Sequence, residues 1–299
     1  NTFFNESEKL LTRGPGRVSP LFVPMMIANI AAGTIAIRFN AKGPCLSTVT
    51  ACATGTHSIG EAFRAIRHGY ADAILAGGSE AAVMPLSIAG FANCMALTTR
   101  NDPQNASIPF DKRRDGFVLG EGAAVLVLEE YEHAASRGAK IYAEIVGYGS
   151  TCDAFHITAP VEDGSGAAKA IQLALQEAGH KEDDRIYINA HGTSTPLNDK
   201  TETKAIKLAL GDGAYAAMIS STKSMTGHML GAAGAAEAVA TVLAVKNGVL
   251  PPTIGLNEPD EECDLDYIPH KARKTSVSLG LSISLGFGGH NAVLAVRPL

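Results

Sequence analysis

The order of motifs along this chain repeats, and this repeat most constrains how the chain can fold. In each copy a Ser-Thr pair precedes a turn, an apolar helix and a closing glycine, and a Gly-Phe pair precedes a short apolar strand. The first copy uses Ser47-Thr48, Gly69 and Gly116-Phe117, and the second uses Ser221-Thr222, Gly248 and Gly286-Phe287. The offset is about 170 residues each time, which is the size of a domain. We therefore predict a duplicated α/β unit, with a first half over residues 1–140 and a second half over residues 141–299.

The two predicted halves differ in their opening segments. The second half has a strand, a helix and a further strand between Ile141 and Ala217, ahead of its Ser-Thr pair. The first half has only a short segment ahead of Cys45. We therefore expect that the chain begins inside the first copy, and that these residues fold poorly unless the missing strand and helix are supplied separately.

Composition excludes several classes of protein. The 299 residues are 46% hydrophobic, which is enough for a large core, and the net charge of −5 without any basic run argues against nucleic-acid binding. No apolar stretch is long enough to span a bilayer. The five cysteines are scattered, without Cys-x-x-Cys spacing, so neither a disulfide framework nor a metal site is expected and a reducing cytoplasm is the simplest location.

Hydrophobic periodicity predicts alternating helices and strands. Ser19-Pro20 resembles an N-cap followed by proline at the first helical position. The expected helices span about residues 21–38, 53–69, 130–137, 166–178, 200–210 and 231–246. The expected strands span about residues 71–76, 123–128, 141–148, 186–189, 217–220, 275–282 and 292–296, with a turn at Gly77-Gly78 and a polar loop over 101–114.

One cysteine stands where a β-branched run passes into a helix. The run from Ser47 to Thr50 predicts a strand, and small residues surround Cys52 before the helix begins. Unpaired N–H groups and the positive end of the helix dipole would lower the pKa of a thiol there and favour the thiolate. We therefore predict that Cys52 is a nucleophile, although an inert packing cysteine remains an alternative.

Two histidines stand in matching contexts. His191 follows the buried strand 186–189, and His228 follows the Ser-Thr pair of the second copy, close behind Lys223. Pseudo-symmetry would bring both near Cys52, although either histidine alone could be structural. The remaining histidines are interpreted as structural, for His57 in the Cys52 helix, or as surface residues, for His68, His133, His180 and His270.

Several motifs together resemble one family. They are TACATG at Cys52, NAHGTSTPLNDKTE at His191, STKSMTGHMLGAAGAAE at His228, DGFVLGEGA at Phe117 and GFGGHNAVL at Phe287. The chain closely resembles the elongating β-ketoacyl-acyl carrier protein synthases, type II, over its whole length. The resemblance implies the thiolase-like fold, which is a duplicated α/β unit in a layered αβαβα arrangement.

The resemblance implies a mechanism and its residues. Cys52 would take an acyl group from acyl carrier protein, and His191 and His228 would assist decarboxylation of malonyl carrier protein and hold the resulting enolate oxygen. Backbone N–H groups of Cys52 and Phe287 would form a second oxyanion hole. Lys223 would pair with Glu237, although an ordinary solvated lysine is the alternative.

Further residues carry roles that the resemblance alone implies. They are Thr193 and Thr195 for phosphopantetheine, Phe117 and Phe287 as aromatic gates that could instead be plain core, and Asp199 and Glu202 as structural support. Phe22 would line the acyl tunnel of a partner in a homodimer, and the strand 71–76 would pair across the two-fold axis, unless Phe22 only packs on its own helix. No metal or free cofactor is implied, because phosphopantetheine arrives on the carrier protein.

Two features qualify this assignment. Ile283 stands where the family has asparagine, whose amide can form several hydrogen bonds. This difference puts in doubt the position of the following loop and the presence of a monovalent cation near Asn189. Because carrier protein is acidic, we expect a cationic rim for which Arg100, Lys112 and Arg113 are candidates.

Other functions remain as alternatives. A polyketide-type ketosynthase would differ in its acyl pocket, and a biosynthetic thiolase would need a second cysteine near the Gly286-Phe287 loop. A cysteine hydrolase gives no reason for two histidines and Lys223, and a non-catalytic partner subunit typically lacks the cysteine present here.

Overall fold

A computed structural model describes residues 2–299. It forms two compact units, one that ends at Val49 and one that spans Thr50–Leu299. These units are defined by contacts, so the division into two duplicated halves near residue 140 stays a prediction.

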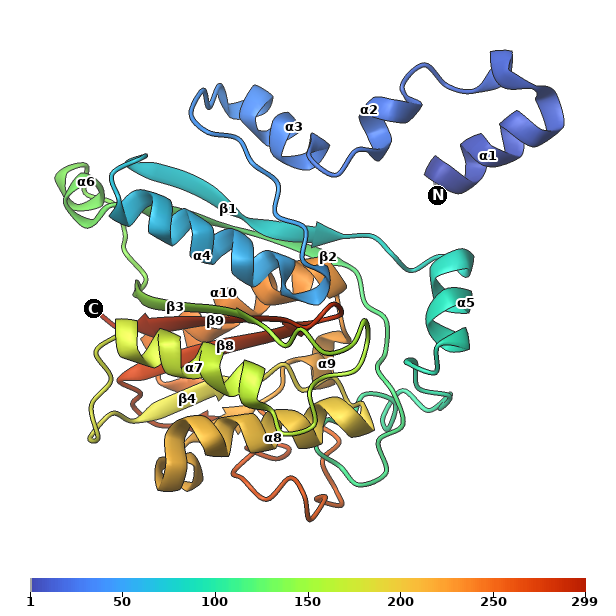
Figure 1. Cartoon of the computed structure of the whole chain (residues 1–299). Helices are drawn as coiled ribbons and strands as arrows, with labels where there is room; N and C mark the ends of the chain where they lie inside the picture. The colour runs from blue at the N-terminus through green and yellow to red at the C-terminus, as the bar shows by residue number, and fades with distance from the viewer. Residues whose placement is uncertain (1) are drawn as a thin grey trace. The chain divides into compact units, whose positions relative to one another are not determined.

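The first unit consists of short helices (Figure 1). They are α1 (Thr2–Arg13), a 3₁₀ turn at Pro15–Arg17, α2 (Phe22–Met26) and α3 (Ile30–Phe39). The single helix predicted over residues 21–38 is therefore wrong, because the chain leaves the helix at Ile27, which is extended at φ −67° and ψ 138°. Apolar spacing continues across this break and could not reveal it. Ser19 does act near the helix start, since its hydroxyl accepts the N–H of Leu21 at 3.2 Å.

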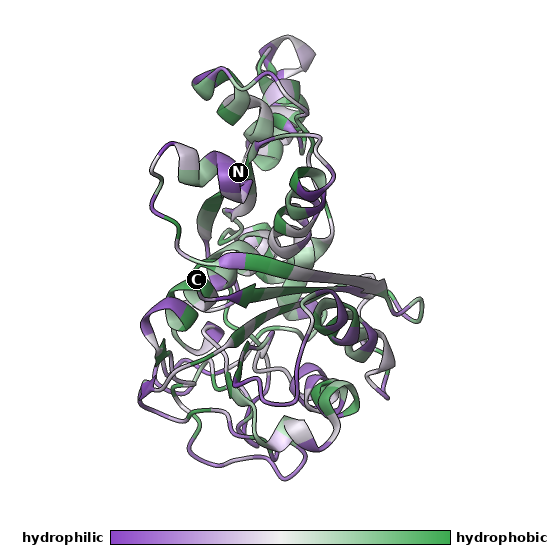
Figure 2. Cartoon of the chain, turned by 90° about the vertical axis from the view of Figure 1, so that its left-hand side faces the viewer, coloured by the Kyte–Doolittle hydropathy of each residue, from purple (hydrophilic) through white to green (hydrophobic). Residues whose placement is uncertain are grey.

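The second unit is layered, with helices on both sides of a five-stranded sheet. The sheet order is β3-β9-β8-β4-β5, and β4 runs parallel to β5 and β8 while β9 is antiparallel to β8 and β3. These strands are β3 (Glu144–Cys152), β4 (Ile186–Asn189), β5 (Met218–Ser220), β8 (Leu279–Gly286) and β9 (His290–Arg297). Figure 2 shows that hydrophobic residues follow the strands and hydrophilic residues the loops.

Two helices lie between this sheet and a smaller antiparallel one. The small sheet pairs β1 (Ala73–Glu80) with β2 (Gly122–Glu129). α4 (Thr54–Arg67) and α10 (Ala233–Asn247) lie between the two sheets, and α7 (Ser165–Glu177) and α8 (Pro196–Leu210) cover the far face of the large one (Figure 1). The mixed α/β layers agree with the predicted fold class. The order of helix and antiparallel pair also occurs twice, in α4-β1-β2 and α10-β8-β9, as a duplication requires.

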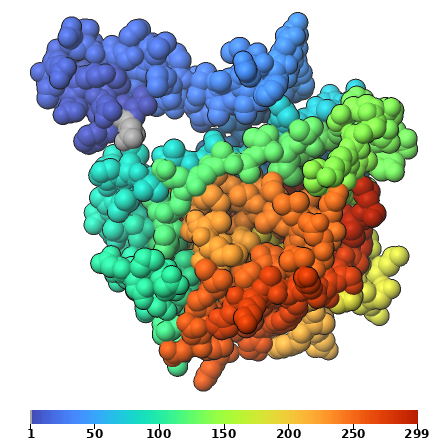
Figure 3. Space-filling view, turned by 180° about the vertical axis from the view of Figure 1, so that it is seen from behind, coloured from blue at the N-terminus to red at the C-terminus, as the bar shows by residue number. Residues whose placement is uncertain are grey.

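The remaining elements are short. They are α5 (Pro85–Asn93), α6 (Tyr131–Ser136), α9 (Lys223–Thr226), β6 (Val249–Leu250), β7 (Arg273–Lys274) and the 3₁₀ turns Ala51–Ala53, Gly211–Tyr215 and Leu230–Ala232. Figure 3 shows that the irregular segment after α10 lies over one face, beside the segment that precedes β2. Asp111 joins these segments by accepting the N–H groups of Asn257 and Glu258 at 2.9 and 2.8 Å.

Glycines allow the two central helices to approach closely. A Cβ at Gly55 in α4 would lie 2.5 Å from the backbone nitrogen of Ala235 in α10, and one at Gly234 would lie 2.2 Å from Thr56 Oγ1. Real Cβ atoms do not approach other atoms so closely. The small residues after Cys52 are therefore needed for helix contact as well as for access to the sulfur.

Three predictions about strands are wrong. Gly77 and Gly78 lie inside β1, paired with β2, and not in a turn. Glycine is required there because a Cβ at Gly77 would lie 2.0 Å from the carbonyl oxygen of Ala124 on the neighbouring strand. Residues 47–50 form no strand, since no described strand pairs with them. β8 begins at Leu279 and ends at Gly286, four residues later at each end than the predicted 275–282, so Ile283 lies in its interior.

Candidate active site

Cys52 lies in a strained turn ahead of α4. Ala51 has φ +49°, a left-handed conformation that costs a non-glycine residue about 1–3 kcal/mol. Thr50 holds the turn locally, because its N–H donates to Thr54 Oγ1 at 2.9 Å and its carbonyl accepts the N–H of Ala53 at 3.1 Å. The structure thus has the sharp turn before a helix that the sequence predicts, although without a preceding strand.

The predicted direction of the Cys52 pKa is wrong. Cys52 is half-buried, and burial raises the pKa of its thiol to about 11. Lys223 and the backbone N–H groups of Phe287 and of Cys52 itself act in the opposite direction. Loss of water around the sulfur therefore outweighs the favourable donors, and the resting thiol keeps its proton at neutral pH.

The two predicted histidines lie together. His191 follows the end of β4 and His228 follows α9, and their rings meet edge to face with centroids 5.2 Å apart. Both are buried. Burial, followed by the charge of Lys223, holds the pKa of each well below its usual range. Both imidazoles are therefore neutral at physiological pH, and each carries one N–H donor.

Lys223 fixes which nitrogen of His191 carries the proton. The buried Lys223 ammonium donates to Glu237 and lies 3.3 Å from Nδ1 of His191. Because an ammonium group has no acceptor, Nδ1 must accept and the ring proton must sit on Nε2. The predicted pair of Lys223 and Glu237 is present in the structure, and the alternative of a solvated lysine is wrong.

Neither ring nitrogen of His228 has a hydrogen-bond partner among residues 2–299, although both atoms are buried. The ring meets Phe117 edge to face at 5.2 Å between centroids, and the backbone N–H of His228 donates to the carbonyl of Val118 at 2.7 Å. A buried polar group without a partner costs about 1–3 kcal/mol. An oxygen of a bound substrate would remove that cost.

A buried carboxylate holds the loop that carries His191. Glu202 accepts the N–H of His191 at 2.6 Å and that of Gly192 at 2.7 Å, and burial raises the pKa of Glu202 to about 7. Further along the same loop, the hydroxyls of Thr193 and Thr195 lie 2.9 Å apart. These contacts fit the structural role expected for Glu202.

Sequence reasoning did not identify Arg114, which lies in the predicted polar loop. It forms buried ion pairs with Asp199 at 3.4 Å and Asp260 at 2.6 Å, and it donates to the carbonyl of Pro196 at 3.1 Å. Asp199 also accepts the N–H of Phe110 at 2.9 Å. This network holds the start of α8, and a charged side chain in a polar stretch gave no signal of burial.

The two gate candidates differ in exposure. Phe117 is buried between Phe91 and His228, whereas Phe287 is 37% exposed. Ile283 is fully buried in β8 opposite Val293. Its apolar side chain is thus part of the core, and it lies in the strand ahead of the loop.

The candidates for a cationic rim are paired within the chain. Lys112 lies 2.9 Å from Glu258, Arg113 lies 2.8 Å from Asp111, and Arg100 lies 3.6 Å from Asp115. Their charges are therefore partly offset, which weakens the expectation that they attract an acidic partner.

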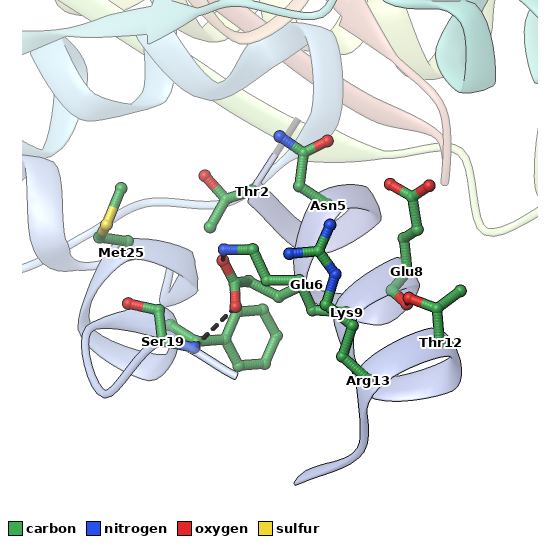
Figure 4. Close-up of a pocket in the computed structure, with 10 residues that line it drawn as sticks. Thr2, Asn5, Glu6, Glu8, Lys9, Thr12, Arg13, Ser19 and Met25 are labelled. Atoms are coloured by element: carbon green, nitrogen blue, oxygen red, sulfur yellow. Dashed lines mark hydrogen bonds and ion pairs between the residues drawn. The ribbon is translucent and has the colours of Figure 1, made fainter. Parts of the chain in front are cut away.

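Phe22 lies in the first unit, where it lines a pocket with residues of α1 and with Ser19 (Figure 4). Glu6 is the polar centre of that pocket and accepts from Lys9 and from the N–H of Ser19 at 2.6 and 2.7 Å. The role of Phe22 in the acyl tunnel of a partner stays a prediction.

Two kinds of feature are absent from residues 2–299. No group of three His, Cys, Asp or Glu side chains there could hold a metal ion. No described helix is both long and apolar enough to cross a membrane.

A layered α/β fold in which a cysteine precedes a helix and two neutral histidines lie beside a buried lysine is suited to thiol-based acyl transfer. Comparison with known proteins agrees. Residues 2–134 match the N-terminal domain of beta-ketoacyl synthase and residues 142–257 match its C-terminal domain. The chain belongs to the beta-ketoacyl synthase family.

Two curated relatives carry the same name. The chain is 60% identical to 3-oxoacyl-[acyl-carrier-protein] synthase 2 of Synechocystis, over 96% of this chain and 70% of the relative. It is 52% identical to the protein of that name from Staphylococcus aureus, over 99% of this chain and 73% of the relative. These relatives confirm the predicted family and enzyme class, and they favour fatty-acid elongation over the alternatives.

Solved structures confirm the fold. A type II polyketide ketosynthase in complex with its acyl-carrier protein has a TM-score of 0.95 and 40% identity, covering 100% of this chain and 76% of its own. A beta-ketoacyl synthase from Burkholderia phymatum has a TM-score of 0.92 and 40% identity, covering 99% and 72%.

Proposed function

We propose that this chain extends acyl chains by two carbons, with Cys52 as nucleophile and His191 and His228 as donors to the malonyl group. The observation that carries the proposal is the buried imidazole of His228, which lies beside His191 and whose ring nitrogens have no hydrogen-bond partner in the described part of the chain. Two neutral N–H donors at this position suit an oxyanion that develops during reaction.

The first half-reaction moves the acyl group to the enzyme. A bond forms between the acyl carbon and Cys52 Sγ, the carrier's thioester bond breaks, and the thiol proton leaves with the carrier's sulfur. Because burial raises the pKa of Cys52 to about 11, the proton must leave as the substrate approaches and not beforehand. The backbone N–H groups of Cys52 and Phe287, which act on this sulfur, would then meet the charge on the acyl oxygen.

The second half-reaction forms the carbon–carbon bond. Malonyl thioester loses carbon dioxide, and the electron pair of the broken bond becomes an enolate whose oxygen accepts from Nε2 of His191 and from His228. The enolate carbon attacks the acyl carbonyl on Cys52, and the Cys52 thiolate leaves. No electron donor, metal or free cofactor enters this balance.

The partner follows from the substrate. Acyl and malonyl groups would arrive as phosphopantetheine thioesters on acyl carrier protein, and the hydroxyls of Thr193 and Thr195 would accept and donate hydrogen bonds to the pantetheine amides. We further propose a cytoplasmic homodimer in which Phe22 lines the partner's acyl tunnel.

Intact mass spectrometry tests the proposal. Acyl carrier protein that carries an acyl chain should leave one acyl adduct on Cys52. Later addition of carrier protein that carries a malonyl group should remove this adduct. The second step should release carbon dioxide and a product two carbons longer. His228→Ala should keep some acylation and lose condensation, whereas His68→Ala at an exposed position should change neither. An adduct on another cysteine, or release of free acid without carbon dioxide, would contradict the assignment. Turnover only with polyketide intermediates would favour a polyketide ketosynthase.

A further inference from the structure

The first turn of α4 carries a buried imidazole that the proposed chemistry does not use. His57 is 6% exposed. Its Nδ1 lies 2.8 Å from Thr50 Oγ1, and its Nε2 lies 3.1 Å from Ser150 Oγ in β3. The ring therefore joins the residue that opens the Cys52 turn to the central sheet.

The Cys52 turn needs such a support. Ala51 is held at φ +49°, and strain of this kind persists only where the surroundings determine the backbone from several sides. The other two bonds of Thr50, to Thr54 Oγ1 and from the N–H of Ala53, are local to the turn. The bond to His57 connects the turn to a strand far along the chain, through Ser150.

The protonation state of His57 suits this bridge. Burial, followed by the charge of the neighbouring His290, lowers the pKa of His57, so the ring is neutral. A neutral imidazole has one donor and one acceptor, and the hydroxyls of Thr50 and Ser150 can each take either role. Both bonds can therefore form at once.

We propose that His57 is a positioning residue for the nucleophile, which holds Thr50 and thereby the strained turn that aims Cys52 at the acyl group. This inference rests on the proposed function, because it requires Cys52 to be the group that is acylated. One consequence distinguishes a positioning role of His57 from a merely structural role. Loss of the bridge should slow transfer to Cys52 and leave malonyl decarboxylation at His191 and His228 unchanged.

The test measures both half-reactions in the same variants. Acylation of Cys52 is followed by intact mass from an acyl-pantetheine thioester, and decarboxylation is followed as carbon dioxide released from malonyl-pantetheine without an acyl donor. His57→Ala should slow acylation about 10- to 100-fold, and Thr50→Val, which removes one hydroxyl at constant shape, should slow it about tenfold. His57→Asn places an amide near the Nδ1 position and should recover most of the rate.

A matched control lies further along α4. Arg67 donates to Glu177 in α7 at 2.5 Å and contacts neither Thr50 nor Ser150, so Arg67→Met should leave acylation unchanged. Acylation at the unmodified rate in Thr50→Val, or in a His57→Ala variant that folds, would overturn the inference. So would an equal fall of both half-reactions in Thr50→Val. If the unmodified chain gains no adduct on Cys52, the proposed function fails and the inference fails with it.

Discussion

Replacement of Lys223 by methionine isolates the electrostatics of the buried site. The change Lys223→Met keeps most of the length of the side chain and removes its charge. Glu237 then loses its only cation, in a place where its Oε2 already has no partner among residues 2–299. An unpaired buried charge costs about 3–5 kcal/mol of unfolding free energy. The carboxyl can avoid part of this cost by taking a proton, because burial already raises its pKa.

This proton gives the variant a characteristic pH dependence. The unfolded carboxyl ionises near its ordinary value, whereas the folded one keeps its proton to higher pH. Between the two values the folded state binds more protons than the unfolded state, so the unfolding free energy falls as pH rises, by at most about 1.4 kcal/mol per pH unit. In the unmodified chain Lys223 opposes the rise in the pKa of Glu237. Loss of Lys223 should therefore make the unfolding free energy fall more steeply with pH.

Thermal unfolding followed by circular dichroism measures the effect, since the sequence contains no tryptophan. At about 2 °C per kcal/mol, Lys223→Met should lower Tm by about 6–10 °C at pH 8 and by less at pH 5. The double change Lys223→Met with Glu237→Gln removes both charges and should abolish the extra slope. A single variant whose Tm follows the double variant at every pH would refute the reasoning.

Two further predictions concern the nucleophile and its helix. Because burial raises the pKa of Cys52 to about 11, its alkylation by iodoacetamide should still increase from pH 9 to 10.5 in peptide-mapped time courses, and a plateau near the ordinary thiol value of about 8.5 would contradict this. Gly55→Ala should destabilise the chain by about 1–3 kcal/mol, because its Cβ would lie 2.5 Å from the backbone of Ala235. Gly90→Ala in α5, where a Cβ meets nothing within 4 Å, is the control and should be neutral or stabilising by up to about 1 kcal/mol in the same melts. Equal Tm values for the two variants would show that α4 and α10 do not need glycine.

Periodicity and caps predicted those elements that bury one continuous face. α7 and α10 lie within two residues of their predicted bounds, and β4 matches its predicted range. Prediction failed where distant backbone decides the structure. Gly77 and Gly78 indicate a turn by their type, yet they lie in a strand. Glycine is needed in that strand because the neighbouring backbone leaves no room for a Cβ.

In the candidate site, too, local features could be predicted and long-range contacts could not. The strand-end contexts of His191 and His228 and the resemblance predicted which side chains meet. They did not predict the pKa of Cys52, because the helix start is a local feature and burial comes from the whole fold. His57 was interpreted as structural because its spacing places it inside a helix. Its partner Ser150 lies on a strand that no local pattern connects to it.

Four ionisable groups of the site shift toward their neutral forms, and this shift has a chemical consequence. Burial raises the pKa of Cys52 and Glu237 and lowers that of His191 and His228. The charge that develops on an acyl or enolate oxygen then meets fixed N–H dipoles and Lys223 where little water screens them, and there such contacts are strongest. Exclusion of water therefore makes Cys52 a weaker nucleophile at rest and stabilises the transition states. Reactivity should then appear only when substrate is bound.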